Sequence, residues 1–93
     1  MYNYFQCIGE IKESKFRSDH QVGEIDLTLT LTKEFKNANG QFDKYDLTFK
    51  LYGPMISIFM DIENPIGKKA SIKGRIGTRD NQIELIAERI IVL

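Results

Sequence analysis

The sequence predicts an all-β domain, a five-stranded barrel with one short helix between the third and fourth strands. Three observations predict it. Apolar and polar residues alternate with a period of two over several segments, which is typical of strands with one buried side. Glycines interrupt the first and fourth of these segments, where a sheet must bend sharply to close. One stretch of helical periodicity follows the third segment, where a helix can cover one end of the barrel.

The size and charge of the chain restrict the classes of protein to consider. Its 93 residues make a single domain spanning 1–93, and 42% hydrophobic and 28% charged residues are typical of a globular protein. Thirteen basic and thirteen acidic residues argue against a highly basic nucleic-acid binder, although one face can still carry positive charge. Any binding to nucleic acid should therefore be modest in affinity and sensitive to salt.

The cysteine count and the apolar runs bear on location. A single cysteine, Cys7, excludes an internal disulfide and is consistent with a reducing cytoplasm. No apolar run approaches the ~20 residues that cross a bilayer. The first six residues lack the pattern of a secretory signal. We therefore expect a cytoplasmic protein without a membrane segment.

The first half of the chain predicts two strands and a loop. The first strand is expected from Asn3 to about Lys12, with Gly9 as a bulge or bend, and the polar segment Ser14–Gln21 reads as a loop. The second strand runs from Gly23 to about Lys33. Its predicted buried side consists of Ile25, Leu27, Leu29 and Leu31, and its predicted wet side consists of Glu24, Asp26, Thr28, Thr30 and Thr32.

A third strand follows the turn signal Asn39–Gly40 and runs from about Phe42 to Tyr52. Its predicted core face consists of Tyr45, Leu47, Phe49 and Leu51. Because these residues already fill that face, Tyr52 must stand on the opposite, polar face with Thr48 and Lys50. A tyrosine on a polar face either stacks a base or packs under a loop or a second subunit.

The second half predicts one helix and two strands. Gly53–Pro54 ends the third strand and starts a helix that stops before Asn64–Pro65. Its predicted apolar face is Met55, Ile58, Phe59 and Ile62, with Ile56 and Met60 off that face. A fourth strand follows Gly67 and alternates from Ala70 to Ile76, Asp80–Asn81 forms a tight turn, and the last strand spans Gln82 to about Val92. This order fits the five-stranded oligonucleotide/oligosaccharide-binding barrel, or OB-fold. The competing small SH3-like barrel would not normally carry a helix of this length here.

The residue types that perform catalysis are scarce. The one histidine, His20, lies in a polar segment without a visible partner, and Cys7 lies among apolar neighbours as a packing residue would. No zinc-ligand spacing and no phosphate-binding glycine loop is present. We therefore expect no catalytic residue, no metal, no cofactor and no enzymatic activity.

Aromatic rings among cations indicate a binding surface for single-stranded nucleic acid. Phe35 lies between Lys33 and Lys36 and would either fold back to cap the barrel or stack a base. Cations on polar faces and turns could form a track for phosphates, although such charges are also typical of a merely solvated face; Glu24 and Asp26 would weaken the track at one end. These cations are Lys33, Lys36, Lys50, Lys73, Arg75 and Arg79.

Four pieces of the chain, in order, resemble the bacterial and phage single-stranded DNA-binding proteins, a family with the OB-fold. They are the strand Cys7–Ile11, the strand and hairpin Leu29–Gly40, the aromatic-glycine pair in Leu51–Gly53, and the segment Gly67–Arg79, which ends Gly-Arg-Ile-Gly-Thr-Arg. The resemblance covers nearly the whole chain. It implies base stacking by Phe35 and Tyr52.

The same resemblance also implies that parts of the family pattern are missing. A third stacking position falls at Asp46, so either a bulge shifts this strand or the site is absent, and the fourth, near Asn81, has no ring. The chain ends Ile90–Leu93 without the family's acidic tip, so recruitment of other enzymes through it is not expected. The family implies a homodimer or homotetramer built through the first strand. The chain also resembles the small primosomal OB proteins, which bind single strands as dimers; a phage or mobile-element variant is equally compatible.

Two hypotheses of different classes follow. The first is sequence-tolerant binding of single-stranded DNA in replication, recombination or repair, by base stacking and phosphate contacts, with RNA not distinguished. The alternative is a protein-interaction or assembly module that keeps the barrel and binds DNA weakly or not at all.

Overall fold

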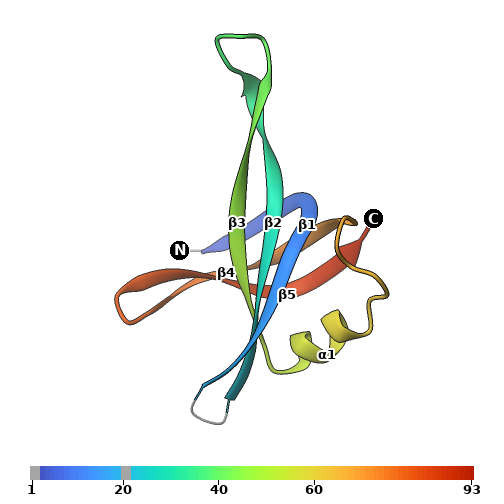
Figure 1. Cartoon of the computed structure of the whole chain (residues 1–93). Coiled ribbons are helices and arrows are strands. Elements are labelled where there is room, and N and C mark those ends of the chain that lie inside the picture. Colours follow the sequence, from blue (N-terminus) through green and yellow to red (C-terminus); the bar gives the residue numbers. More distant parts are fainter. Residues whose placement is uncertain (1–2, 20–21) are drawn as a thin grey trace.

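A computed structural model, which describes residues 3–19 and 22–93, shows that the chain forms a closed five-stranded barrel (Figure 1). Around the barrel the strands follow the order β1-β2-β3-β5-β4, and one short helix lies between β3 and β4, which confirms the predicted OB-fold. The elements are β1 (Tyr4–Asp19), β2 (Val22–Lys36), β3 (Phe42–Tyr52), α1 (Pro54–Met60), β4 (Lys69–Arg79) and β5 (Gln82–Val92).

Strand β1 joins the two halves of the barrel and is longer than predicted. Its first half, Tyr4 to Glu10, pairs with β4, and from Glu10 onward it pairs with β2. The predicted loop from Ser14 is wrong, because residues 14–19 continue the pairing with β2. Side chains 12–18 of β1 are exposed, so the sequence shows no apolar alternation there. His20 lies outside the described residues.

Two glycines allow strands to cross at close range. Of the two alternatives at Gly9, the bulge is wrong, since the register of β1 against β2 shifts between Ile11 and Glu13 instead; a bend is compatible with the change of partner from β4 to β2 at Glu10. A Cβ at Gly9 would lie 2.6 Å from the carbonyl oxygen of Thr30, and one at Gly74 would lie 1.8 Å from that of Ile86. Only a residue without a side chain permits these approaches.

The core lies between the inner faces of the strands and α1. The inward alternation of β2 is confirmed, since its four predicted residues are buried. On β3, Phe49 and Leu51 are fully buried and the ring of Phe49 lies 5.4 Å from that of Phe5, centroid to centroid. Tyr45, predicted in the core, is 40% exposed because this end of β3 extends beyond the barrel. Burying a side chain such as Phe49 stabilises the fold by about 1.5–3 kcal/mol.

Helix α1 begins as predicted, with Gly53 at a positive φ of 54° followed by Pro54. Met55 and Phe59 are buried in the core. The predicted placement of Ile58 is wrong, since this residue is exposed and Ile56 packs against the core in its place. The buried face is therefore centred between Met55, Ile56 and Phe59. Within residues 3–19 and 22–93, no helix is long and apolar enough to cross a membrane.

Hairpins project from the barrel in different directions (Figure 1). One of them is the far half of the β2–β3 hairpin, residues 32–45, which we call the arm. Its turn is confirmed near Gly40, at φ 75°, where the side-chain oxygen of Asn37 accepts hydrogen bonds from two backbone amides. The predicted turn at Asp80–Asn81 is also confirmed, with both residues at positive φ. Strands β3 and β5 close the barrel through one parallel bridge, between Lys50 and Ile86.

Candidate nucleic-acid interface

The structure divides the predicted binding residues into three groups. Tyr52 pairs with Glu24, and Phe35 lies eleven residues further along β2. At ~3.3 Å per residue the two rings stand about 35 Å apart along the strand. The groups are Lys33, Phe35 and Lys36 on the arm, Lys50, Tyr52 and Arg79 beside the helix end of β3, and Lys73 and Arg75 on β4.

The second group belongs to a network that we call the ion-pair cluster. Its centre is Asp26, whose two carboxylate oxygens pair with Lys50 Nζ at 2.6 Å and with Arg17 Nε at 2.9 Å. One carboxylate therefore engages both cations, Lys50 and Arg17. The full cluster consists of Arg17, Glu24, Asp26, Lys50, Tyr52, Arg79 and Glu84.

The other half of the cluster surrounds Tyr52. Arg79 Nη1 lies 3.2 Å from a carboxylate oxygen of Glu24 and donates a 3.4 Å hydrogen bond to the Tyr52 hydroxyl. The Tyr52 hydroxyl in turn donates to Glu84 at 3.1 Å. Burial raises the pKa of Tyr52; the hydrogen bond from Arg79 opposes this effect and the Glu84 carboxylate adds to it. The hydrogen bond to Tyr52 and the charge of Glu24 raise the pKa of Arg79.

The prediction that Glu24, Asp26 and Thr28 face water is wrong. Only 7%, 7% and 8% of these residues are exposed. The long side chains of Arg17, on β1, and Arg79, on β4, reach across from other strands. The aliphatic stems of such side chains cover the shorter ones beneath them.

Asp46 occupies the position where a third stacking ring was expected. Lys12 Nζ lies 2.6 Å from one of its oxygens and Thr30 donates to the other at 2.9 Å. The hydrogen bond from Lys12, followed by that from Thr30, lowers the pKa of Asp46. The β2–β3 register is unbroken past this point, so no bulge turns Tyr45 to this face. Of the two alternatives, a missing ring on this face is correct.

The arm displays its ring and cations openly. Phe35 is 82% exposed, which excludes the alternative that it folds back to cap the barrel. It lies in β2 itself, where the register shifts between Thr32 and Lys36. Lys36 stands over the ring of Phe42, with its Nζ 5.8 Å from the ring centre. Neither Lys33 nor Lys36 forms an ion pair with any described residue.

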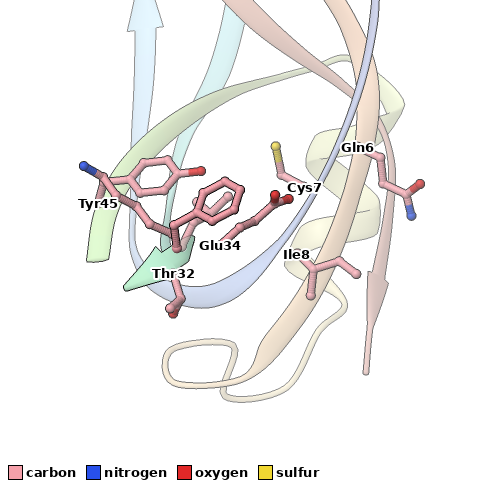
Figure 2. Close-up of a pocket in the computed structure, with 9 residues that line it drawn as sticks. Gln6, Cys7, Ile8, Thr32, Glu34 and Tyr45 are labelled. Carbon is pink, nitrogen blue, oxygen red and sulfur yellow. The ribbon is translucent and has the colours of Figure 1, made fainter. Parts of the chain in front are cut away.

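A pocket of about 580 Å³ separates the arm from the first half of β1. Figure 2 shows Tyr45, Thr32 and Glu34 on the arm side and Gln6, Cys7 and Ile8 on the opposite side. The lining is completed by Leu31, Lys33 and Phe35. Sequence reasoning missed Tyr45 and Glu34 as pocket residues. The sequence signal for them was that the apolar alternation of β2 ends at Leu31. In the structure Leu31 pairs with Tyr45.

The third group lies on the outside of β4. Arg75 Nε stands 3.7 Å from a Glu88 oxygen, and both side chains are about half exposed, so this pair contributes little. Lys73 is exposed and forms no ion pair with any described residue.

The structure places Cys7 at the pocket as a partly buried residue that packs against the core. Burial raises the pKa of its thiol, so the reactive thiolate is disfavoured, as expected of a packing residue. Among residues 3–19 and 22–93 no group of His, Cys, Asp and Glu side chains could hold a metal ion.

The closed barrel and the helix after β3 place the chain in the class of OB-fold proteins. No protein-family model and no curated protein sequence matches it. Among solved structures, it is similar to the PriB protein of Ralstonia solanacearum, with a TM-score of 0.75, 14% identity and 100% of both chains covered.

Two further structures are similar over nearly their whole length. The single-stranded DNA-binding protein of Plasmodium falciparum, solved in complex with single-stranded DNA, gives a TM-score of 0.66 at 15% identity, covering 100% of this chain and 96% of that one. The dimeric N-terminal domain of PriB from Thermoanaerobacter tencongensis gives 0.68 at 14%, covering 98% and 96%. At these identities the likeness establishes the fold.

Proposed function

We propose that the protein is a non-enzymatic binder of single-stranded DNA with little sequence preference. The observation that carries this proposal is the exposed ring of Phe35 between Lys33 and Lys36, two cations without an ion pair to any described residue. Flat rings beside cations stack bases and neutralise phosphates, whatever the sequence. The similar structure from Plasmodium falciparum, solved with single-stranded DNA, supports the proposal.

The predicted residues would contribute unequally. Phe35 stacks a base, while Lys33, Lys36 and Lys73 contact phosphates directly. The remaining predicted residues already have carboxylate partners. Lys50 and Arg79 must exchange theirs to contact a phosphate, whereas Arg75 is held only by a weak, exposed pair. Tyr52 would stack with its ring while its hydroxyl stays bonded to Glu84. Because stacking and phosphate contacts are common to both polymers, RNA would bind by the same means.

The edge of β1 supports a homodimer. Strand β2 joins β1 only from Glu10, so in the first half of β1 the edge opposite β4 faces the pocket and not a strand. A second copy of this strand could pair there, in competition with any ligand of the pocket, and one similar structure is dimeric. Light scattering distinguishes this dimer from a tetramer and a monomer. Participation in replication, recombination or repair is the role that such a binder would have.

Fluorescence anisotropy of a labelled oligo-dT at low salt tests the proposal, with duplex DNA of equal length as the control. Phe35→Ala should weaken binding about tenfold, since one stacked base contributes ~1–3 kcal/mol. The matched control is Phe16→Ala, another exposed phenylalanine but on the ribbon of β1 and β2 far from the arm, which should change nothing. No binding at micromolar protein, or equal binding to duplex, would overturn the proposal.

A protein-interaction module is the second candidate. The ion-pair cluster favours it, because its three cations are balanced by three carboxylates. On α1, Met60 is 68% exposed and could join such an interface, whereas Ile56 packs against the core and could not. Partners that stay bound to the protein after nuclease treatment would favour this second function over DNA binding.

A further inference from the structure

The pocket between the arm and β1 has aromatic rings and a carboxylate in its lining to which no role has been given so far. It lies on the inner side of the ribbon, because Leu31 and its pairing partner Tyr45 continue the inward faces of β2 and β3. Tyr52 stands on the other side. The volume of the pocket, about 580 Å³, is within the range of small-ligand pockets, roughly 300–1,000 Å³.

Two rings line this pocket while remaining accessible. Tyr45 is 40% exposed and Phe35 is 82% exposed. Leu31, buried at 6% exposed, adds apolar lining. An apolar wall with flat rings suits one face of a nucleobase, whereas a phosphate would find no cation except Lys33.

Besides Gln6, Thr32 and Lys33, the polar lining of the pocket includes one carboxylate. Glu34 extends from the arm across the pocket toward the β1 side (Figure 2) and has no ion pair with any described residue. A carboxylate repels phosphate and accepts hydrogen bonds from amino groups, such as N4 of cytosine. Thymine presents a carbonyl oxygen at the corresponding position.

We propose that this pocket takes one unstacked base of a bound single strand, with Tyr45 and Phe35 against its face and Glu34 accepting from its amino group. This inference rests on the proposed function and adds a preference for cytosine over thymine. The phosphates of the strand stay outside, near Lys33 and Lys36. Tyr45 thereby supplies, from the inner side, a ring that Asp46 cannot supply on the outer side.

The only cysteine of the chain provides a direct readout, because Cys7 lines the pocket. Its alkylation by N-ethylmaleimide is followed by mass spectrometry, without DNA and with saturating oligo-dC or oligo-dT. We expect oligo-dC to slow alkylation at least about fivefold. A rate that is unchanged by DNA, or that falls only with protein concentration as a second copy covers Cys7, overturns the inference.

Variants test the roles of the ring and the carboxylate. Tyr45→Leu should weaken binding of oligo-dC about tenfold, while Tyr52→Leu, the matched control on the outer side, should weaken it less. The ratio of oligo-dC to oligo-dT affinity should be roughly three- to tenfold in the wild type. Glu34→Gln should bring this ratio close to one, because an amide can pair with an amino group or a carbonyl.

The two proposals fail in different ways. If the protein binds oligonucleotides and Phe35→Ala weakens binding, but Cys7 is not protected and Tyr45→Leu has no effect, the base pocket is wrong and the proposed function stands. If no oligonucleotide binds, both are overturned. Circular dichroism of each variant verifies that the barrel is intact.

Discussion

The two ends of the β2–β3 ribbon carry similar residues in opposite states. Beside Tyr52, each cation of the ion-pair cluster has a carboxylate partner within 4.0 Å. On the arm, Lys33 and Lys36 have no such partner among the described residues, and Phe35 is open to solvent. The comparison shows that cations at the two ends of one ribbon can differ in whether carboxylates already engage them, and the proposed DNA binding depends on this difference.

The cause of the difference is the position of each end in the barrel. Around Tyr52, strands β1, β4 and β5 lie close enough to bring Arg17, Arg79 and Glu84 over β2 and β3. The arm projects from the barrel (Figure 1), so its two strands pair only with each other, and β1 faces them across the pocket. Cations on the arm therefore remain without a carboxylate partner among the described residues.

The largest effect that would test this comparison is the loss of both arm rings. Phe35→Ala combined with Tyr45→Leu should reduce affinity for oligo-dC at least about 30-fold, because both rings contact the bound base and stacking of one base contributes ~1–3 kcal/mol. Tyr52→Leu should cost no more than about threefold. Anisotropy titrations at one salt concentration measure both, and a larger loss for Tyr52→Leu would reverse the ranking of the two ends.

Removing the central carboxylate of the ion-pair cluster should affect stability. Asp26→Ala leaves Lys50 and Arg17 without their partner at a site that is 7% exposed, and should lower the free energy of unfolding by about 1–3 kcal/mol. Urea denaturation measures the change. The control is Asp43→Ala on the arm, which loses one exposed hydrogen bond from Asn37 and should have a much smaller effect. Equal effects would mean that the cluster does not stabilise the barrel.

Weakening the cluster without emptying it should improve binding. Glu84→Gln keeps an acceptor for the Tyr52 hydroxyl but removes one of the negative charges near Arg79, so affinity for oligo-dT at low salt should rise about two- to fivefold. Glu88→Gln removes the same charge from an exposed pair and should raise affinity less. Because misfolding does not increase affinity, a gain is informative, and a decrease in the Glu84 variant would contradict the prediction.

The smallest expected effect is the loss of stability at low pH when Asp46 is protonated. Lys12 and Thr30 lower the pKa of Asp46 in the folded protein, so the stabilisation is present above the usual aspartate range and is lost as pH falls through the lowered pKa. Melting temperatures of the wild type and Asp46→Asn should differ slightly at neutral pH and converge in acid. A difference that grows in acid would have the wrong sign.

Alternation along single strands predicted much of the fold but not the state of the site. It placed Tyr52 correctly on the outer side and the four apolar residues of β2 in the core. It could not predict that Glu24 is covered, because Arg79 comes from a strand 55 residues away. It also placed Tyr45 in the core, since periodicity continues along a ribbon whether or not a barrel still surrounds it.

Because a single bridge, between Lys50 and Ile86, joins β3 to β5, the barrel should open most easily between these two strands. Separating β3 from β5 there would leave both hairpins and both pairings of β1 intact, giving one continuous sheet in the order β3-β2-β1-β4-β5. Such local opening costs less than global unfolding, so amide hydrogens at the bridge should exchange faster than those between β1 and β2. In this respect the barrel is one five-stranded sheet whose two edge strands, β3 and β5, are held together by a short pairing.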